Sequence, residues 1–175
     1  MGDGTRKLYI LFVLFFWCLA VSESMVSPVL AAEDGTFAGT WVANGSKEVL
    51  ALGSDRETAL FKLSGDVNLT NIIGKESNYW SECIGFADSE TGSDIRCVWR
   101  SLHGDEIYLA MKGTRLEKGS SISGSIIGGT GAAKGITGTL RFTWSMISFD
   151  QVDNETGKTG ISGFSKDVNG TYKLP

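Results

Sequence analysis

The sequence predicts an all-β protein, a single antiparallel barrel of about eight strands that is held by one disulfide bond. The first observation is composition: the chain of 175 residues holds 23 glycines and only two prolines, as is typical of short strands joined by tight turns. The second is that no long segment has uninterrupted helical periodicity. The third is a closely spaced series of segments in which apolar and polar residues alternate, as they do in barrels and sandwiches.

Residues 1–31 are predicted to be a signal peptide that does not belong to the folded domain. A short basic segment precedes the apolar run Leu8–Val21, whose roughly 14 residues suit a signal-peptide core and are too few for a membrane span. Cleavage could follow Ser22 or Ala31, and the second position has the better motif of small residues. An uncleaved N-terminal anchor is the alternative. Residues 32–175 would then form one secreted or periplasmic domain with no stable membrane span.

Composition argues against several classes of function. The formal net charge of −4, together with the lack of a basic cluster, makes nucleic acid an unexpected partner. The chain has one histidine, His103, and no Gly-x-Ser-x-Gly motif, so neither a zinc site nor a serine nucleophile is supported. We therefore expect no metal ion and no cofactor.

The predicted strands follow one another at short intervals. Asn44-Gly45 is a favoured turn pair and is expected to end the first strand. The segment Gly53–Arg56 is expected to close the next hairpin, and the polar segment Ala87–Gly92 the one after it. The segment Val67–Ile73 has no assigned role. The predicted strands are Thr36–Ala43, Lys47–Leu52, Thr58–Ser64, Asn78–Phe86, Asp94–Leu102, Glu106–Lys112, Ser120–Ile127, Gly138–Phe149, Ile161–Phe164 and Gly170–Leu174.

Two cysteines, Cys83 and Cys97, remain after removal of the signal peptide. An even number in an exported protein indicates a disulfide bond, and a redox-active or metal-binding pair would need further ligands. If the two cysteines face each other across a hairpin, opposed residues have numbers that add up to 180. Trp80 then faces Arg100 on the side of the hairpin opposite the disulfide, and Glu82 lies on that side too. The crosslink would contribute about 3 kcal/mol to stability.

The next hairpin predicts which side of these strands is the inside. A two-residue turn at Gly104 would place Arg96 and Arg100 on the same side as the apolar residues of Glu106–Lys112. Glu82, Arg96 and Arg100 would then point into the lumen beside Trp80. Because buried charges must be paired and hydrogen-bonded, such a cluster indicates a ligand site or a salt-bridged plug. The alternative is that this face is exposed to solvent and that Trp80 stacks on Arg100.

A glycine-rich loop connects two of the predicted strands. Its glycines permit positive φ angles and close contact between chains, which indicates a structural loop. It lacks the Gly-Lys-Ser/Thr ending of a phosphate-binding loop. The strand that follows alternates cleanly, and its Leu140, Phe142 and Trp144 are expected in the core. The glycines of the loop are Gly128, Gly129, Gly131, Gly135 and Gly138.

The segment Ile126–Gly138, Ile-Ile-Gly-Gly-Thr-Gly-Ala-Ala-Lys-Gly-Ile-Thr-Gly, resembles the Gly-Gly-Thr-Gly-x-(aromatic)-x-Gly-x-x-Gly signature of the allene oxide cyclase and dirigent barrel superfamily. It is similar above all to exported bacterial members without an assigned function. Ala133 stands where that family usually has an aromatic residue, and Ala132 where dirigent proteins often have arginine. The resemblance implies an eight-stranded, lipocalin-like calyx whose lumen holds an apolar small molecule in some members. It transfers no catalytic residue.

Three functions are consistent with these observations. The first is a non-catalytic exported barrel that binds a small apolar or amphipathic ligand in its lumen, lined by Trp80, Arg96 and Arg100. The second is a lumenal isomerase or cyclase of the allene oxide cyclase type, with Glu82 as acid or base. The third is a structural or surface-interaction domain with a filled barrel, which a lumen without a pocket of roughly 300 Å³ would favour. The sequence sets neither the ligand nor the oligomeric state, and it leaves open whether the protein is an enzyme.

Overall fold

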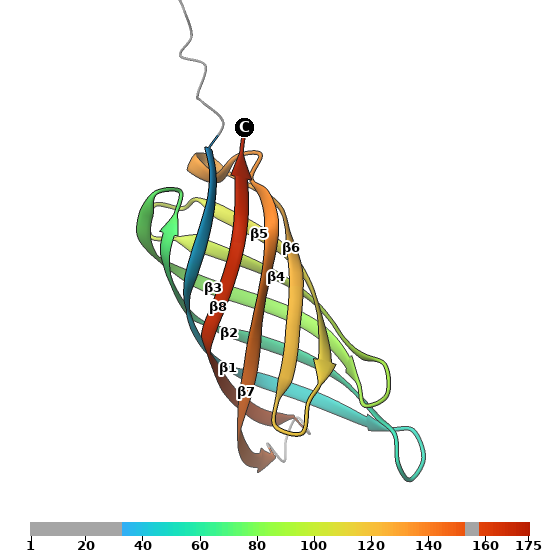
Figure 1. The fold of residues 1–175 in the computed structure, drawn as a ribbon. Helices are drawn as coiled ribbons and strands as arrows, with labels where there is room; N and C mark the ends of the chain where they lie inside the picture. Colours follow the sequence, from blue (N-terminus) through green and yellow to red (C-terminus); the bar gives the residue numbers. More distant parts are fainter. Residues whose placement is uncertain (1–32, 153–157) are drawn as a thin grey trace, which may run out of the picture. The chain divides into compact units, whose positions relative to one another are not determined.

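Eight antiparallel strands form a closed barrel in which each strand pairs with the next and β8 pairs with β1 (Figure 1). The computed structural model describes residues 33–152 and 158–175, so the predicted signal peptide lies outside the described residues. The predicted all-β antiparallel barrel is confirmed. The elements are β1 (Glu33–Ala51), β2 (Glu57–Ile72), β3 (Lys75–Asp88), β4 (Gly92–Ser101), β5 (Glu106–Arg115), β6 (Ser120–Gly129), the 3₁₀ turn η1 (Gly131–Ala133), β7 (Thr137–Val152) and β8 (Thr159–Leu174).

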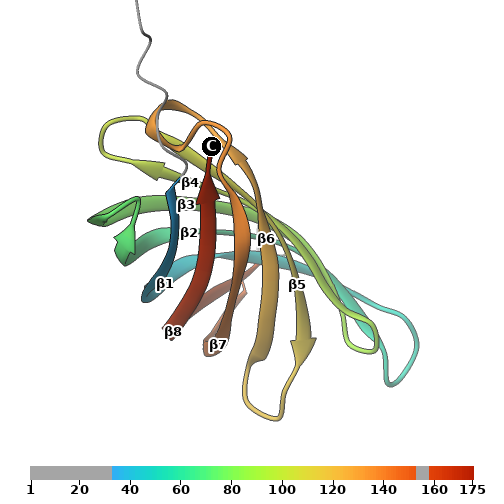
Figure 2. The same cartoon turned by 45° about the horizontal axis from the view of Figure 1, so that its top comes forward.

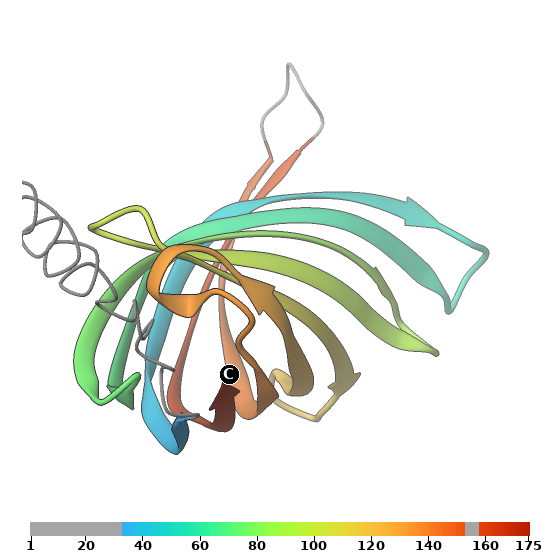
Figure 3. The ribbon, with the colours of Figure 1, turned by 90° about the horizontal axis from the view of Figure 1, so that it is seen from above.

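We call the end of the barrel near the C-terminus, at the top of Figure 1, the upper end and the opposite one the lower end. The β2–β3, β4–β5 and β6–β7 connections lie at the upper end, and the β1–β2 hairpin extends beyond its neighbours at the lower end (Figures 1 and 3). In the described part of the chain, no helix has the length and hydropathy needed to cross a membrane.

The strands are longer and fewer than predicted, because several expected breaks lie inside continuous strands. Asn44-Gly45 does not turn the chain: Asn44 faces Ser64 on β2 and Ser162 on β8. A Cβ at Gly45 would collide with the carbonyl of Lys62, so this glycine permits a close approach of two strands. Pairing along both edges therefore overrides the local turn preference. The unassigned segment Val67–Ile73 is likewise the upper half of β2, except for its last residue.

Aromatic and aliphatic side chains fill the lumen. The ring of Trp41 packs edge-on against Phe142, with centroids 5.4 Å apart, and tilted against Trp144 at 5.0 Å. Leu140, Phe142 and Trp144 are buried, as predicted from the alternation along β7. Glycines make room for several rings: a Cβ at Gly85 would meet the ring of Phe61 on the neighbouring strand. Glycine in these strands thus lets large side chains lie flat on the barrel wall.

The register of β3 against β4 is the predicted one. Cys83 faces Cys97 and Trp80 faces Arg100. The β4–β5 turn differs from the prediction, because three residues, Leu102–Gly104, separate Ser101 from Asp105. Ser101 N–H donates to the Asp105 carbonyl at 2.8 Å, and Gly104 adopts a φ of 85°. The extra residue reverses the side on which every residue of β5 lies relative to β4.

The glycine-rich loop closes the upper end of the barrel. Asp105 accepts a hydrogen bond from the Ala132 N–H at 2.9 Å, which docks η1 on the β4–β5 turn. Ala133 and Ile136 of the docked loop are buried in the core. The loop lies across the upper end (Figures 2 and 3). The φ angle is positive at Gly128, Gly131 and Gly135, while a Cβ at Gly129 or Gly138 would meet the backbone of a neighbouring segment.

Candidate functional site

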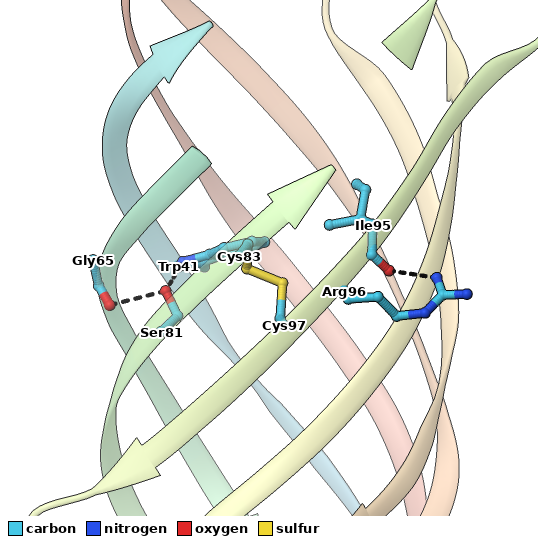
Figure 4. The surroundings of a disulfide bond; sticks show 7 residues. All are labelled: Trp41, Gly65, Ser81, Cys83, Ile95, Arg96 and Cys97. Carbon is cyan, nitrogen blue, oxygen red and sulfur yellow. Dashed lines mark hydrogen bonds between the residues drawn. A yellow bond between two sulfur atoms is a disulfide. The ribbon is translucent and has the colours of Figure 1, made fainter. Parts of the chain in front are cut away.

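The disulfide between Cys83 on β3 and Cys97 on β4 joins two neighbouring strands in the middle of their paired length (Figure 4). Both cysteines are buried, so the predicted disulfide is confirmed and lies on the inner face of the wall. Beside it, Ser81 accepts a hydrogen bond from Trp41 Nε1 at 2.8 Å and donates one to the Gly65 carbonyl at 2.9 Å. This fully buried hydroxyl therefore has both its donor and its acceptor roles satisfied.

A second buried tryptophan lacks such a partner. Trp99 is fully buried, and its Nε1 has no acceptor among the described residues. Its ring is tilted against that of Tyr79, with centroids 6.5 Å apart. Burial is the main cause that raises the pKa of the Tyr79 hydroxyl, because desolvation disfavours the phenolate. Two aromatic rings, those of Tyr79 and Trp99, therefore lie in the upper half of the lumen. No carboxylate of the described residues lies within hydrogen-bonding distance of Trp99 Nε1.

The lower half of the lumen contains a small hollow of about 90 Å³. Its walls are apolar and aromatic, with serine hydroxyls near the starts of β4 and β6 and on β8, and none of the described residues contributes an ionisable side chain to them. Its volume is well below the roughly 300–1,000 Å³ of ordinary ligand pockets. The hollow is lined by Trp41, Phe61, Leu63, Ser93, Ile95, Ser120, Ile122, Phe142, Trp144, Met146, Ile161 and Ser162.

The residues predicted to line the lumen lie on the outer face of the barrel. Trp80 is 47% exposed, Arg96 is exposed, and Arg100 and Glu82 are partly exposed. The predicted inward orientation was wrong, and the alternative of a solvent-exposed face is the observed one. The physical reason is the three-residue β4–β5 turn, which aligns Ile107, Leu109 and Met111 with the disulfide side of β4 instead.

Arg100 joins two carboxylates on this outer face. Its Nε donates to Glu106 at 2.9 Å and its Nη1 to Glu82 at 3.2 Å. Tyr108 OH donates to the other oxygen of Glu106 at 2.7 Å, and this bond, followed by that from Arg100, holds the pKa of the Glu106 carboxyl below its usual value. Glu106 and Tyr108 were not predicted to belong to this cluster. The correct turn length would have placed them there, since Glu106 directly faces Arg100.

A broad, shallow concavity of about 940 Å³ lies on the outer wall, away from the lumen. It crosses β4, β5, β6, β7, β8 and β1 and reaches Asn71 near the end of β2, and we call it the outer groove. Arg96, one of the predicted ligand-binding residues, lines it at its β4 border, and its Nη1 donates to the Ile95 carbonyl at 2.9 Å (Figure 4). The structure thus separates Arg96, which lines the groove, from Trp80 and Arg100, which do not.

Comparison with known proteins gives little beyond a distant likeness. No protein-family model matches the chain, and no curated protein matches its sequence. Among solved structures, the chain is similar to the pterocarpan synthase dirigent protein GePTS1, with 14% sequence identity and a TM-score of 0.42. The match covers 79% of this chain and 86% of that one.

Proposed function

We propose that this protein is an exported, non-catalytic β-barrel whose lumen is filled by its own side chains and which acts through its outer surface. The packed lumen carries this proposal. Large side chains that are fully buried, among them Trp99, Leu109 and Met111, occupy its interior. The hollow that is left at the lower end, about 90 Å³, is less than a third of the smallest ordinary ligand pocket.

The position of the candidate acid or base argues against a lumenal enzyme. Glu82 lies on the outer face and is held by Arg100 at 3.2 Å, so it cannot reach a substrate in the lumen.

The tyrosine hydroxyls next to the core have raised pKa values, mainly because of burial. Tyr79 is one of them, and Tyr172, which donates to Glu33 at 2.8 Å, is the other. Neither group is shifted toward the neutral pKa that a general base requires.

Two observations support export. The lumen contains a disulfide bond, and such bonds persist in oxidising compartments outside the cytosol. The N-terminal segment has the charge and apolar length of a signal peptide.

The test is a search for lumenal ligands in protein secreted with its disulfide intact. Native mass spectrometry should give the mass of the processed, oxidised chain with no retained ligand, and a titration with a fluorescent fatty acid should show no saturable binding. Two tryptophan variants serve as a matched pair: Trp144→Ala opens the lower lumen, whereas Trp80→Ala changes only the outer face. Saturable binding to the unmodified protein that Trp144→Ala strengthens or weakens and Trp80→Ala preserves would contradict a filled barrel.

The second candidate is a carrier of a small apolar ligand at the lower end of the lumen, and the lining of the hollow favours it. This apolar hollow of about 90 Å³ is smaller than the engineered cavity of about 150 Å³ that binds benzene, so its ligand would be no larger than one small ring or a short alkyl segment. The ligand would contact Trp41 and Trp144, so binding should change tryptophan fluorescence. Leu63→Phe, which fills the hollow, should prevent that change, whereas Leu60→Phe on the outer face should not.

A further inference from the structure

The outer groove is built from side chains that lie in register across six strands. One row consists of Thr36, Thr171, Thr139, Ser125, Ala110 and Arg96, each directly opposite the next. A parallel row two residues away carries the charged residues Arg141, Lys112 and Asp94, again in register with one another through Ser123. Short side chains thus form the floor of a groove that runs continuously across the strands. Charged side chains lie at its β4 border and along one side.

The charge of the groove is opposite to that of the protein. The whole chain has a net charge of −4, but the groove contains three cations and one carboxylate. Lys112 makes only a loose ion pair with Asp94, at 3.8 Å. Among the side chains that the structure describes, which exclude those of residues 76 and 148–157, no carboxylate lies within 4 Å of the guanidinium of Arg96 or Arg141. Arg141 can therefore bind an anion in two-point geometry, and Arg96, whose Nη1 donates to the Ile95 carbonyl, can offer its Nε and Nη2.

The remaining surface of the groove offers hydroxyls and no backbone edge. Thr139 and Thr171 share a hydrogen bond between their hydroxyls at 3.1 Å, and both side chains are exposed. The backbone N–H and C=O groups beneath them bond to neighbouring strands of the closed barrel. A peptide that binds by adding a strand would find no partner here. Hydroxyls that both donate and accept instead match a ligand that itself carries many hydroxyls.

We propose that the outer groove binds an anionic polysaccharide, with carboxylates or sulfates on Arg96 and Arg141 and sugar hydroxyls along the serine and threonine row. The two arginines lie on β4 and β7, three strand spacings or roughly 14 Å apart across the sheet. That distance suits two anionic groups of one extended chain and is too long for a single phosphate or sulfate. The inference rests on the proposed function, in which the protein acts through its outer surface.

The experiment titrates the secreted, oxidised protein with polygalacturonate, dextran sulfate and neutral dextran by isothermal calorimetry. We expect binding of one or both polyanions that weakens with added salt, and no binding of neutral dextran. The carboxylated and sulfated polymers separate the two possible anionic groups. The double variant Arg96→Gln/Arg141→Gln should weaken binding at least tenfold. Arg115→Gln, which removes an exposed arginine of β5 outside the groove, should leave it unchanged.

Three outcomes would overturn the inference: no binding of either polyanion, equal weakening by Arg115→Gln, or equal binding of neutral dextran. A fourth is a self-associated form in sedimentation that the double variant dissociates, because the groove would then be covered by a second copy of the chain. Circular dichroism and the melting temperature check that each variant is folded. The fatty-acid titration of the same preparation tests the filled lumen separately, so failure of one proposal does not conceal failure of the other.

Discussion

The indole of Trp41 on β1 donates to the hydroxyl of Ser81 on β3 at 2.8 Å, although β2 lies between these two strands. Ser81 in turn donates to the carbonyl of Gly65 on β2. One buried hydroxyl therefore connects three strands from inside the lumen. Its central position makes it a sensitive indicator of how tightly the lumen is packed.

Replacing Ser81 with alanine should destabilise the barrel by about 1–3 kcal/mol, because the Trp41 N–H would be left buried without an acceptor. Chemical denaturation followed by tryptophan fluorescence measures the change. Ser64→Ala, on the outer side of β2, is the matched control and should shift the free energy of unfolding by less than about 0.5 kcal/mol. Equal effects of the two substitutions would show that the lumen admits water at Ser81.

Loss of the disulfide should cost about 3 kcal/mol, because the crosslink joins residues 14 positions apart and restricts the unfolded chain. The double variant Cys83→Ala/Cys97→Ala should therefore unfold at lower denaturant concentration than the oxidised protein. A reducing agent should lower the midpoint of the unmodified protein and leave that of the double variant unchanged. Identical midpoints for the oxidised and reduced protein would contradict a stabilising crosslink.

Stability should fall in acid partly through Asp88. Arg56 donates to its carboxylate at 2.7 Å, and this bond is the main cause that holds the pKa of Asp88 below its ordinary value. The unfolded-state pKa, about 3.9, is the higher of the two, so the interaction stabilises the fold above that pH. Its contribution is lost as the pH falls through the lower, folded-state pKa.

The measurement compares melting temperatures of the unmodified protein and Asp88→Asn from pH 7 to pH 2. The difference should be largest near neutral pH and should shrink below about pH 4. Asp66→Asn is the control, because this exposed carboxylate on β2 has no ion-pair partner among the described residues. A difference for Asp88→Asn that stays constant across the range would exclude the linkage.

The docking of the glycine-rich loop can be tested by two alanine substitutions at positive φ. Gly104 has a φ of 85° and open space around it, so Gly104→Ala should cost only the backbone strain, about 1–2 kcal/mol. Gly131 has a φ of 56°, and a Cβ there would also meet the carboxylate of Asp105. Gly131→Ala should therefore cost about 1 kcal/mol more, because the displaced Asp105 carboxylate would lose the hydrogen bond from the Ala132 N–H. Thermal unfolding of the two variants side by side measures the difference.

The sequence by itself determined the fold class, the disulfide and the register of the hairpin that carries it. Alternation with a period of two marks half-buried strands, and two cysteines in one hairpin allow only one in-register pairing once they are bonded. The same reasoning correctly placed Trp80, Glu82, Arg96 and Arg100 together on one face of the wall.

Tertiary structure alone decided which face is the inside. One additional residue in the Leu102–Gly104 turn exchanges the lumen-facing and the solvent-facing side chains of a whole strand. The local sequence does not specify the length of this turn. Pairing along both edges of β1 also carried the chain straight through Asn44-Gly45, where the local preference is to turn. The outer groove depends on register across six strands, a relationship that exists only after the barrel has closed.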